Sequence, residues 1–169
     1  MHIAVKIFFN WIKAQYPNYF QNVDVLDCGS LDINGNNRFL FSEYRYTGID
    51  IVDGKNVDVV TKIHDFHPNK QYDIVISSEM LEHDIHYGKS LENMFALTKT
   101  RGLLLITAAG KDRKEHGTTR SIPKDSPLTN DYYMNVTVEM LLQGLDLSKF
   151  SWFNISYVVD DIRFAGIKI

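Results

Sequence analysis

Short apolar runs recur along this chain, and most of them are followed by turn residues such as Gly, Ser, Asp or Asn. Strands that are buried on both faces of a parallel sheet are continuously apolar. Strands are therefore expected at residues 23–28, 46–51, 56–60, 72–78 and 102–108, and two closing strands, paired antiparallel, at 153–159 and 162–169. This succession predicts a doubly wound α/β domain.

Helical spacing of apolar side chains is clearest at residues 2–16, just before Pro17. The pattern favours a helix that packs on the sheet, and a lid over a bound ligand is the alternative. Further helices are expected at residues 38–44, 87–98 and 136–145, the last beginning near Thr137 with Glu139 in its first turn.

The connections around the third strand are unusually short. About four residues separate the strands at 46–51 and 56–60, whereas a parallel crossover usually needs about a dozen or more. Helices are therefore expected to be reduced around strands two to four. Either strand three is very short, or this edge is covered by the N-terminal helix or by a second subunit, which would make the protein a homodimer.

Length and charge restrict the classes of function. The chain has 169 residues, which suits a single domain over 1–169, and its net charge of −3 gives no case for a nucleic-acid surface. No apolar run is long enough to cross a membrane, and Lys6 and Lys13 interrupt the N-terminal segment, which makes it a poor signal peptide. With Cys28 as the single cysteine, a cytoplasmic location is expected.

The segment 23–36, V-D-V-L-D-C-G-S-L-D-I-N-G-N, joins the first strand to a turn. Asp27 stands at the carboxyl end of the strand, and Gly29 and Gly35 let the backbone turn and approach a ligand closely. Asp50 follows 23 positions after Asp27, where an acid reads a ribose diol in nucleotide-binding folds. The full G-x-G-x-x-G spacing is absent, because Ser30 follows Gly29, and this favours a cofactor without a diphosphate.

These residues, together with Y-D-I-V-I-S-S-E-M-L-E-H at 72–83, resemble the class I S-adenosylmethionine-dependent methyltransferases. The run E-H-G-T at 115–118 resembles a subgroup with such a loop after strand five. The resemblance implies a Rossmann-like sheet of about seven strands in the order 3-2-1-4-5-7-6, with the last strand antiparallel. It also implies S-adenosyl-L-methionine lying across the carboxyl ends of strands one and four.

The resemblance further implies which residues hold the cofactor. Asp27 and the Gly29 backbone would face its methionine part, Asp50 the ribose, and Ser78 with Glu79 the sulfonium. Adenine would meet the segment at Lys62 and Ile63, with His64 and Asp65 as substitutes. The complete cofactor set is Asp27, Gly29, Ser30, Asn34, Asp50, Ile51, Ile63, Ser78 and Glu79.

Methyl transfer from a sulfonium is an in-line displacement, so the protein mainly positions the acceptor and excludes water. A base is needed only when the acceptor must lose a proton. His116, with Glu115 orienting its ring, is the first candidate base, and His83 is the second. The structural alternatives are that His83 anchors a helix start and that His116 orders its loop.

The polar segment 109–135 is long enough to predict a substrate-side loop. Arg120, Tyr132 and Tyr133 are its candidate contacts for a neutral or anionic acceptor, and a solvated loop is the alternative. No metal is expected, because the histidine pairs His64–His67 and His83–His86 stand in different segments.

The favoured function is methyl transfer to a small-molecule or sugar-like acceptor. The run Ser77-Ser78-Glu79-Met80 replaces the N/D-P-P-Y/F motif of enzymes that methylate nucleobase amino groups, so a nucleic-acid partner is not expected. Two alternatives remain. One is a non-catalytic subunit that binds S-adenosylmethionine beside a partner, and the other is a nicotinamide-dependent reductase.

Overall fold

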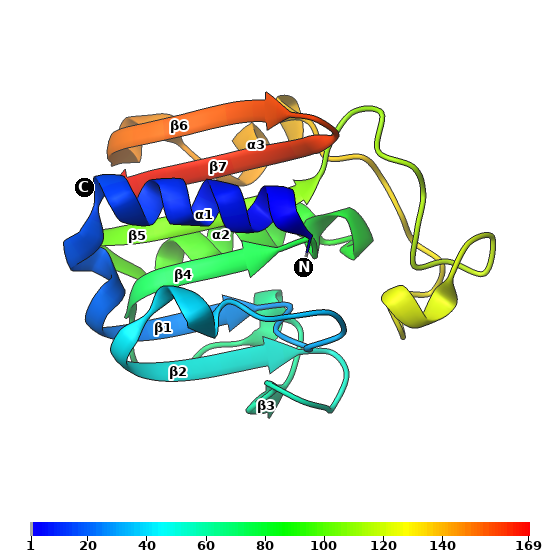
Figure 1. Cartoon of the computed structure of the whole chain (residues 1–169), viewed down its shortest axis with the longest axis horizontal. Coiled ribbons are helices and arrows are strands. Elements are labelled where there is room, and N and C mark those ends of the chain that lie inside the picture. Colours follow the sequence, from blue (N-terminus) through cyan, green and yellow to red (C-terminus); the bar gives the residue numbers. More distant parts are fainter. Residues whose placement is uncertain (1) are drawn as a thin grey trace.

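A computed structural model describes residues 2–169 and shows a seven-stranded sheet in the order β3-β2-β1-β4-β5-β7-β6 (Figure 1). Strand β7 runs antiparallel to both of its neighbours, and all other pairs of neighbours are parallel. The predicted fold class and strand order are therefore confirmed. The strands are β1 (Gln21–Cys28), β2 (Ser42–Asp50), β3 (Val59–Val60), β4 (Tyr72–Ser78), β5 (Thr98–Ala109), β6 (Phe150–Val158) and β7 (Asp161–Lys168).

Three α-helices cover the sheet, with α1 (Ile3–Gln15) on one face and α2 (Tyr87–Leu97) and α3 (Val138–Gly144) on the other (Figure 1). Helix α1 buries Val5, Phe8, Phe9 and Ile12 against the sheet, so the predicted packing role is confirmed. The Thr137 side chain accepts a bond from the Met140 N–H, which caps α3 at the predicted place. None of the helices in residues 2–169 is both long and apolar enough to span a membrane.

The prediction of a helix at residues 38–44 is wrong. A single 3₁₀ turn, Arg38–Leu40, is followed at once by β2, which begins at Ser42. The segment is rich in aromatic residues, which favour strands, and its backbone pairs with β1 from Gln21↔Ser42 onward. Tertiary pairing therefore decides the structure of this segment where its local sequence is ambiguous.

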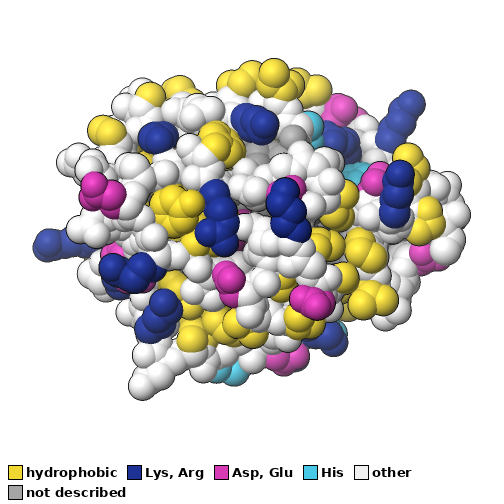
Figure 2. Space-filling view, turned by 60° about the horizontal axis from the view of Figure 1, so that its bottom comes forward, with side chains coloured by type: hydrophobic (Ala, Val, Ile, Leu, Met, Phe, Trp, Pro, Cys, Tyr) yellow, Lys and Arg dark blue, Asp and Glu magenta, His cyan; other side chains and the backbone are white. Residues whose placement is uncertain are grey.

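The predicted shortage of helices between strands two and four is confirmed. Strand β3 contains only Val59 and Val60, and the connections on either side of it hold no α-helix. Both valines are exposed at this edge of the sheet. Apolar and charged side chains are interspersed on the face that carries the edge (Figure 2). A homodimer through this edge stays a prediction.

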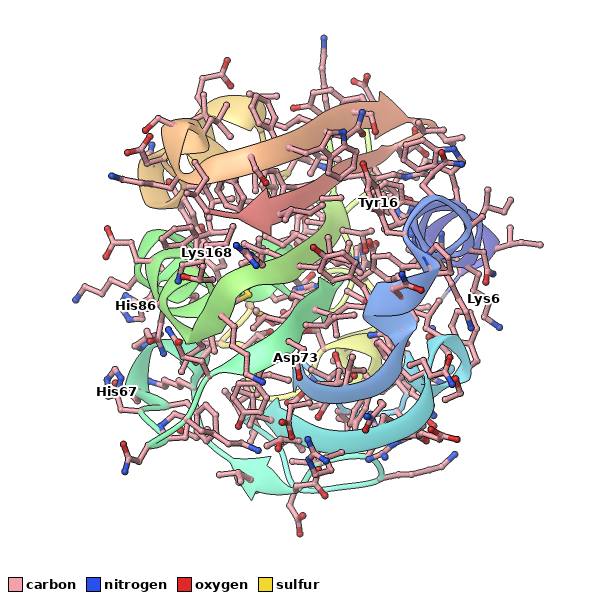
Figure 3. All side chains as sticks on the ribbon, turned by 90° about the vertical axis from the view of Figure 1, so that its left-hand side faces the viewer. Lys6, Tyr16, His67, Asp73, His86 and Lys168 are labelled. Carbon is pink, nitrogen blue, oxygen red and sulfur yellow. The ribbon has the colours of Figure 1, made fainter. Side chains whose placement is uncertain are left out.

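Charged side chains where β4 and β5 begin form hydrogen bonds within the fold (Figure 3). The Lys168 ammonium donates to the Phe95 and Thr98 carbonyls, where α2 ends. Asp73 accepts bonds from the Asp24 N–H and from the Lys99 ammonium at the beginning of β4. These side chains therefore already have partners within the fold. The candidate functional site lies at the carboxyl ends of the parallel strands instead.

Candidate functional site

A cavity of about 680 Å³ opens at the carboxyl ends of β1, β2 and β4. Ligands bind at this edge in open α/β sheets, at the point where the strand order reverses. In this sheet the order reverses between β1 and β4. The segments 113–116 and 125–130 form part of its wall. All nine residues of the expected cofactor set line it: Asp27, Gly29, Ser30, Asn34, Asp50, Ile51, Ile63, Ser78 and Glu79.

Asp27 is buried at the centre of this wall, and its carboxylate is held by two side chains. The Asn37 amide donates to one oxygen at 3.2 Å, and the Tyr46 hydroxyl donates to the other at 2.5 Å. Burial raises the pKa of Asp27 to about 6, although these two bonds lower it. Asn37 also donates to the Ser78 hydroxyl at 3.0 Å, which ties β1 to β4.

Gly29 turns the chain away from β1 with φ of +80°, a conformation that side chains with a Cβ rarely adopt. A Cβ at this position would lie 2.6 Å from the Met80 Cβ, so no larger residue fits. The Gly29 and Ser30 N–H groups both donate to the Ile49 carbonyl. The turn is therefore held against β2 and leaves the cavity open above it.

Asp50 ends β2 with its side chain at the cavity. One carboxylate oxygen accepts a 3.0 Å bond from the Leu31 N–H, and the other accepts a 3.1 Å bond from the Val52 N–H. Burial raises the pKa of Asp50, which these backbone bonds oppose. Ile51 and Ile63 supply apolar surface to the same wall.

Glu79 follows β4 with φ of +56°, a strained backbone conformation for a residue other than glycine. Its carboxylate receives a 3.1 Å contact from His2, which precedes α1 and also lines the cavity. Burial acts to raise the pKa of Glu79, but the bond and charge of His2 and the charge of Arg113 outweigh it and lower that pKa. Arg113 itself pairs with Asp161 at 2.9 Å.

His83 and His116 face each other at the cavity with ring centroids 5.0 Å apart, and the Tyr133 ring packs against both. The His116 Nε2 lies 3.8 Å from the Glu82 carboxylate, which is fully buried. Burial, together with the charge of His116, lowers the pKa of His83 to about 4. His83 is therefore a neutral imidazole at neutral pH.

The other residues expected to bind substrate or orient the base lie differently. Glu115 lines the cavity, but its carboxylate is bound by Arg120 and the Thr118 hydroxyl, so Glu82 is the carboxylate beside His116. Arg120 and Tyr132 are outside the cavity lining, as is Tyr133. Arg120 is bound to Glu115 and the Asp131 carbonyl, and the Tyr133 hydroxyl donates to the backbone carbonyls of residues 113 and 114.

Five residues at or beside the site were not identified from the sequence: His2, Asn37, Met80, Glu82 and Arg113. His2 comes from the segment before α1 and Arg113 from the long loop after β5, and no local pattern marks either residue. Glu82 belongs to the run at 72–83 that carries the family resemblance. A charged residue shortly after the apolar strand in that run is the one sequence feature that could have marked it as a site residue. Its complete burial is visible only in the fold.

Comparison with solved structures shows the same fold in several methyltransferases. A 1,6-didemethyltoxoflavin-N1-methyltransferase from Burkholderia thailandensis, with bound 1,6-didemethyltoxoflavin and S-adenosylhomocysteine, has a TM-score of 0.68 and 18% identity over 98% of this chain and 78% of that one. The N-methyltransferase NodS from Bradyrhizobium japonicum, with S-adenosylhomocysteine, has a TM-score of 0.63 and 11% identity, covering 96% and 86%. Magnesium protoporphyrin IX methyltransferase from Synechocystis, also with S-adenosylhomocysteine, has a TM-score of 0.61 and 15% identity, covering 98% and 82%.

The sequence matches no protein-family model and no curated protein. The structural likeness therefore concerns the fold, which is that of the class I S-adenosylmethionine-dependent methyltransferases.

Proposed function

We propose that this protein binds S-adenosyl-L-methionine and transfers its methyl group to a small-molecule or sugar-like acceptor. The observation that carries the proposal is the cavity at the carboxyl ends of β1, β2 and β4, which all nine residues of the expected cofactor set line. Solved proteins of the same fold hold S-adenosylhomocysteine, and one of them also holds 1,6-didemethyltoxoflavin.

The arrangement of the cavity wall supports one orientation of the cofactor. Asp50 would accept bonds from the ribose hydroxyls, and the isoleucines Ile51 and Ile63 would pack on the adenine. The Gly29 backbone lines the cavity and carries no Cβ, so the methionine part could approach it closely. Glu79, fixed by the contact from His2, would then lie on the sulfonium side of the cavity.

The chemistry requires little from the protein beyond positioning and exclusion of water, because the methyl group on a sulfonium is already activated. In an in-line displacement the acceptor atom bonds to the methyl carbon as the carbon–sulfur bond breaks, and S-adenosylhomocysteine leaves. An acceptor hydroxyl would lose its proton to His116 or His83, both of which line the cavity. A pKa of about 4 leaves His83 neutral but makes it a weak base, so His116 remains the first candidate.

Calorimetric titration with S-adenosylhomocysteine and, separately, with NAD tests the proposal. We expect one site for S-adenosylhomocysteine per chain and no binding of NAD. Binding of NAD in the absence of S-adenosylhomocysteine binding would instead support a reductase. If S-adenosylhomocysteine binds, turnover of labelled S-adenosylmethionine with a panel of hydroxyl and amine acceptors distinguishes an enzyme from a non-catalytic subunit.

A further inference from the structure

Beside the cofactor cavity, the fold brings together three side chains that are metal ligands in many proteins. One ligand atom from each of Glu82, His83 and His116 lies within 4.8 Å of the other two. Glu82 and His83 follow β4, and His116 comes from the long segment after β5. We propose that these three residues bind a divalent transition-metal ion such as Zn²⁺.

The two imidazoles are oriented as metal-binding histidines usually are. The His83 Nδ1 lies 3.4 Å from the Tyr132 carbonyl, and the His116 Nδ1 lies 3.2 Å from the Lys114 carbonyl. A carbonyl can only accept a hydrogen bond, so Nδ1 is the donor in each of these contacts, and a ring bound in this way presents its Nε2 to a metal ion. Backbone carbonyls at the second ring nitrogen are a regular outer-shell feature of histidine metal ligands.

Glu82 is the observation that points most directly to a ligand. Its side chain is fully buried, and among the described residues neither of its carboxylate oxygens has a hydrogen-bond partner. A buried carboxylate without a partner is costly, and proteins compensate it with a cation, a metal ion or a proton. The approach of His116 Nε2 to 3.8 Å places a second ligand atom beside it.

The separations suit a small ion with modest movement of the side chains. With metal–ligand bonds of about 2.1 Å at tetrahedral angles, ligand atoms lie about 3.4 Å apart. The observed separations are at most 4.8 Å, and His116 lies in the segment after β5, outside the helices and strands. Both histidines line the cavity while Glu82 lies behind them, so the fourth position would face the cavity. Two histidines, one carboxylate and an open position form the ligand set of catalytic zinc sites.

The other polar clusters lack this combination. In the group of His2, Glu79 and Asp161, both carboxylates already have hydrogen-bond partners: His2 lies 3.1 Å from Glu79, and Arg113 donates to Asp161 at 2.9 Å. The histidine pairs considered from the sequence are not the pairs that form. His83 meets His116, and His64 meets His86 with ring centroids 4.8 Å apart. The expectation of no metal depended on pairing by sequence distance.

The site also narrows the acceptor class, and this step depends on the proposed methyl transfer. An ion whose open position faces the cavity would bind an acceptor oxygen and lower the pKa of an acceptor hydroxyl. The expected acceptor therefore carries a hydroxyl or carboxylate oxygen next to the methylated atom. In this arrangement His83 and His116 would hold the ion and would not act as bases. A hydroxyl bound to the ion would release its proton to water before the methyl group is transferred.

Zinc binding to the chelator-treated full chain, measured by competition with a chromophoric chelator, tests the proposal without cofactor or acceptor. We expect one Zn²⁺ per chain, and loss of at least about 100-fold in affinity in both Glu82→Gln and His116→Ala. The matched control is His67→Ala, which removes a histidine that is in neither metal group and does not line the cavity. Circular dichroism of each variant confirms that it is folded.

Glu82→Gln keeps the side-chain volume and removes the uncompensated charge, so its metal-free form should unfold at a higher temperature than the wild type. Failure of the wild type to bind Zn²⁺, or equal binding by wild type, Glu82→Gln and His116→Ala, would overturn the proposal. In that case a proton on Glu82 is the occupant of the site. Titration with S-adenosylhomocysteine in parallel separates the two proposals, because loss of one binding event leaves the other measurable.

Discussion

The Asn37 amide donates a 3.2 Å hydrogen bond to the Asp27 carboxylate at the base of the cavity. Asn37 stands in the loop after β1 and is itself buried. Its second bond, to Ser78, reaches the end of β4. This one side chain therefore links the two strand ends across which the cofactor is proposed to bind.

Asn37→Ala should lower the free energy of unfolding by about 1–3 kcal/mol, because it leaves a buried carboxylate oxygen without this donor. Urea unfolding measures the change. Asn37→Asp is the sharper comparison, because it places a second carboxylate beside Asp27, and its loss of stability should be larger at pH 7 than at pH 5. Unchanged stability in both variants would show that this hydrogen bond contributes little.

The raised pKa of Asp27 predicts how stability depends on pH. The folded pKa is about 6, whereas an unfolded aspartate titrates near 4, so the folded state holds the extra proton between these values. Stability contributed by this group is therefore highest below about pH 4 and falls as the pH rises to about 6, by at most about 3 kcal/mol.

Asp27→Asn removes this titration, so the variant should lose less stability than the wild type between pH 4.5 and pH 7. Urea unfolding of both proteins at the two pH values gives the comparison. All other titrating groups are common to both proteins, so the difference between their pH profiles reports Asp27 alone. Parallel pH profiles for the two proteins would contradict the raised pKa.

Two glycine substitutions should act in opposite directions. Gly29→Ala combines a left-handed φ with a Cβ 2.6 Å from Met80, so it should destabilise the protein by more than about 1 kcal/mol and weaken S-adenosylhomocysteine binding. Gly88→Ala, in α2 with no atom within 4 Å of the added Cβ, should stabilise it by about 0.5–1 kcal/mol. Thermal unfolding and calorimetry of the pair measure both effects, and equal losses in the two variants would exclude a special role for the turn.

Asp50→Asn should weaken S-adenosylhomocysteine binding by about 10- to 100-fold, because an amide replaces a charged acceptor of two ribose hydroxyl bonds. The substitution keeps an oxygen that can accept the Leu31 N–H, which limits the effect on the loop. Asp53→Asn, at an exposed position in the next turn, is the matched control and should bind as the wild type does. Equal affinities of all three proteins, measured by calorimetry, would place the ribose elsewhere.

Much of the strand framework follows from local sequence. Residues 72–78 form β4 with the expected bounds, because a run of buried β-branched residues is stable as a central strand in almost any context. The positions of Asp27 and Asp50 at strand ends follow from the same runs. The segment 38–44 enters a strand in place of the expected helix, since its aromatic residues gain their partners only when β2 pairs with β1.

The sequence by itself determined the strands, their order through the family resemblance, and the set of residues around the proposed cofactor. Only the tertiary structure placed Asn37 on Asp27 and set His116 beside Glu82. It also separated Arg120 from the cavity that it was expected to line. The reason is physical: strand formation depends on the apolar pattern of neighbouring residues, whereas these contacts join segments whose relative position is set by sheet order and by the path of a long polar loop.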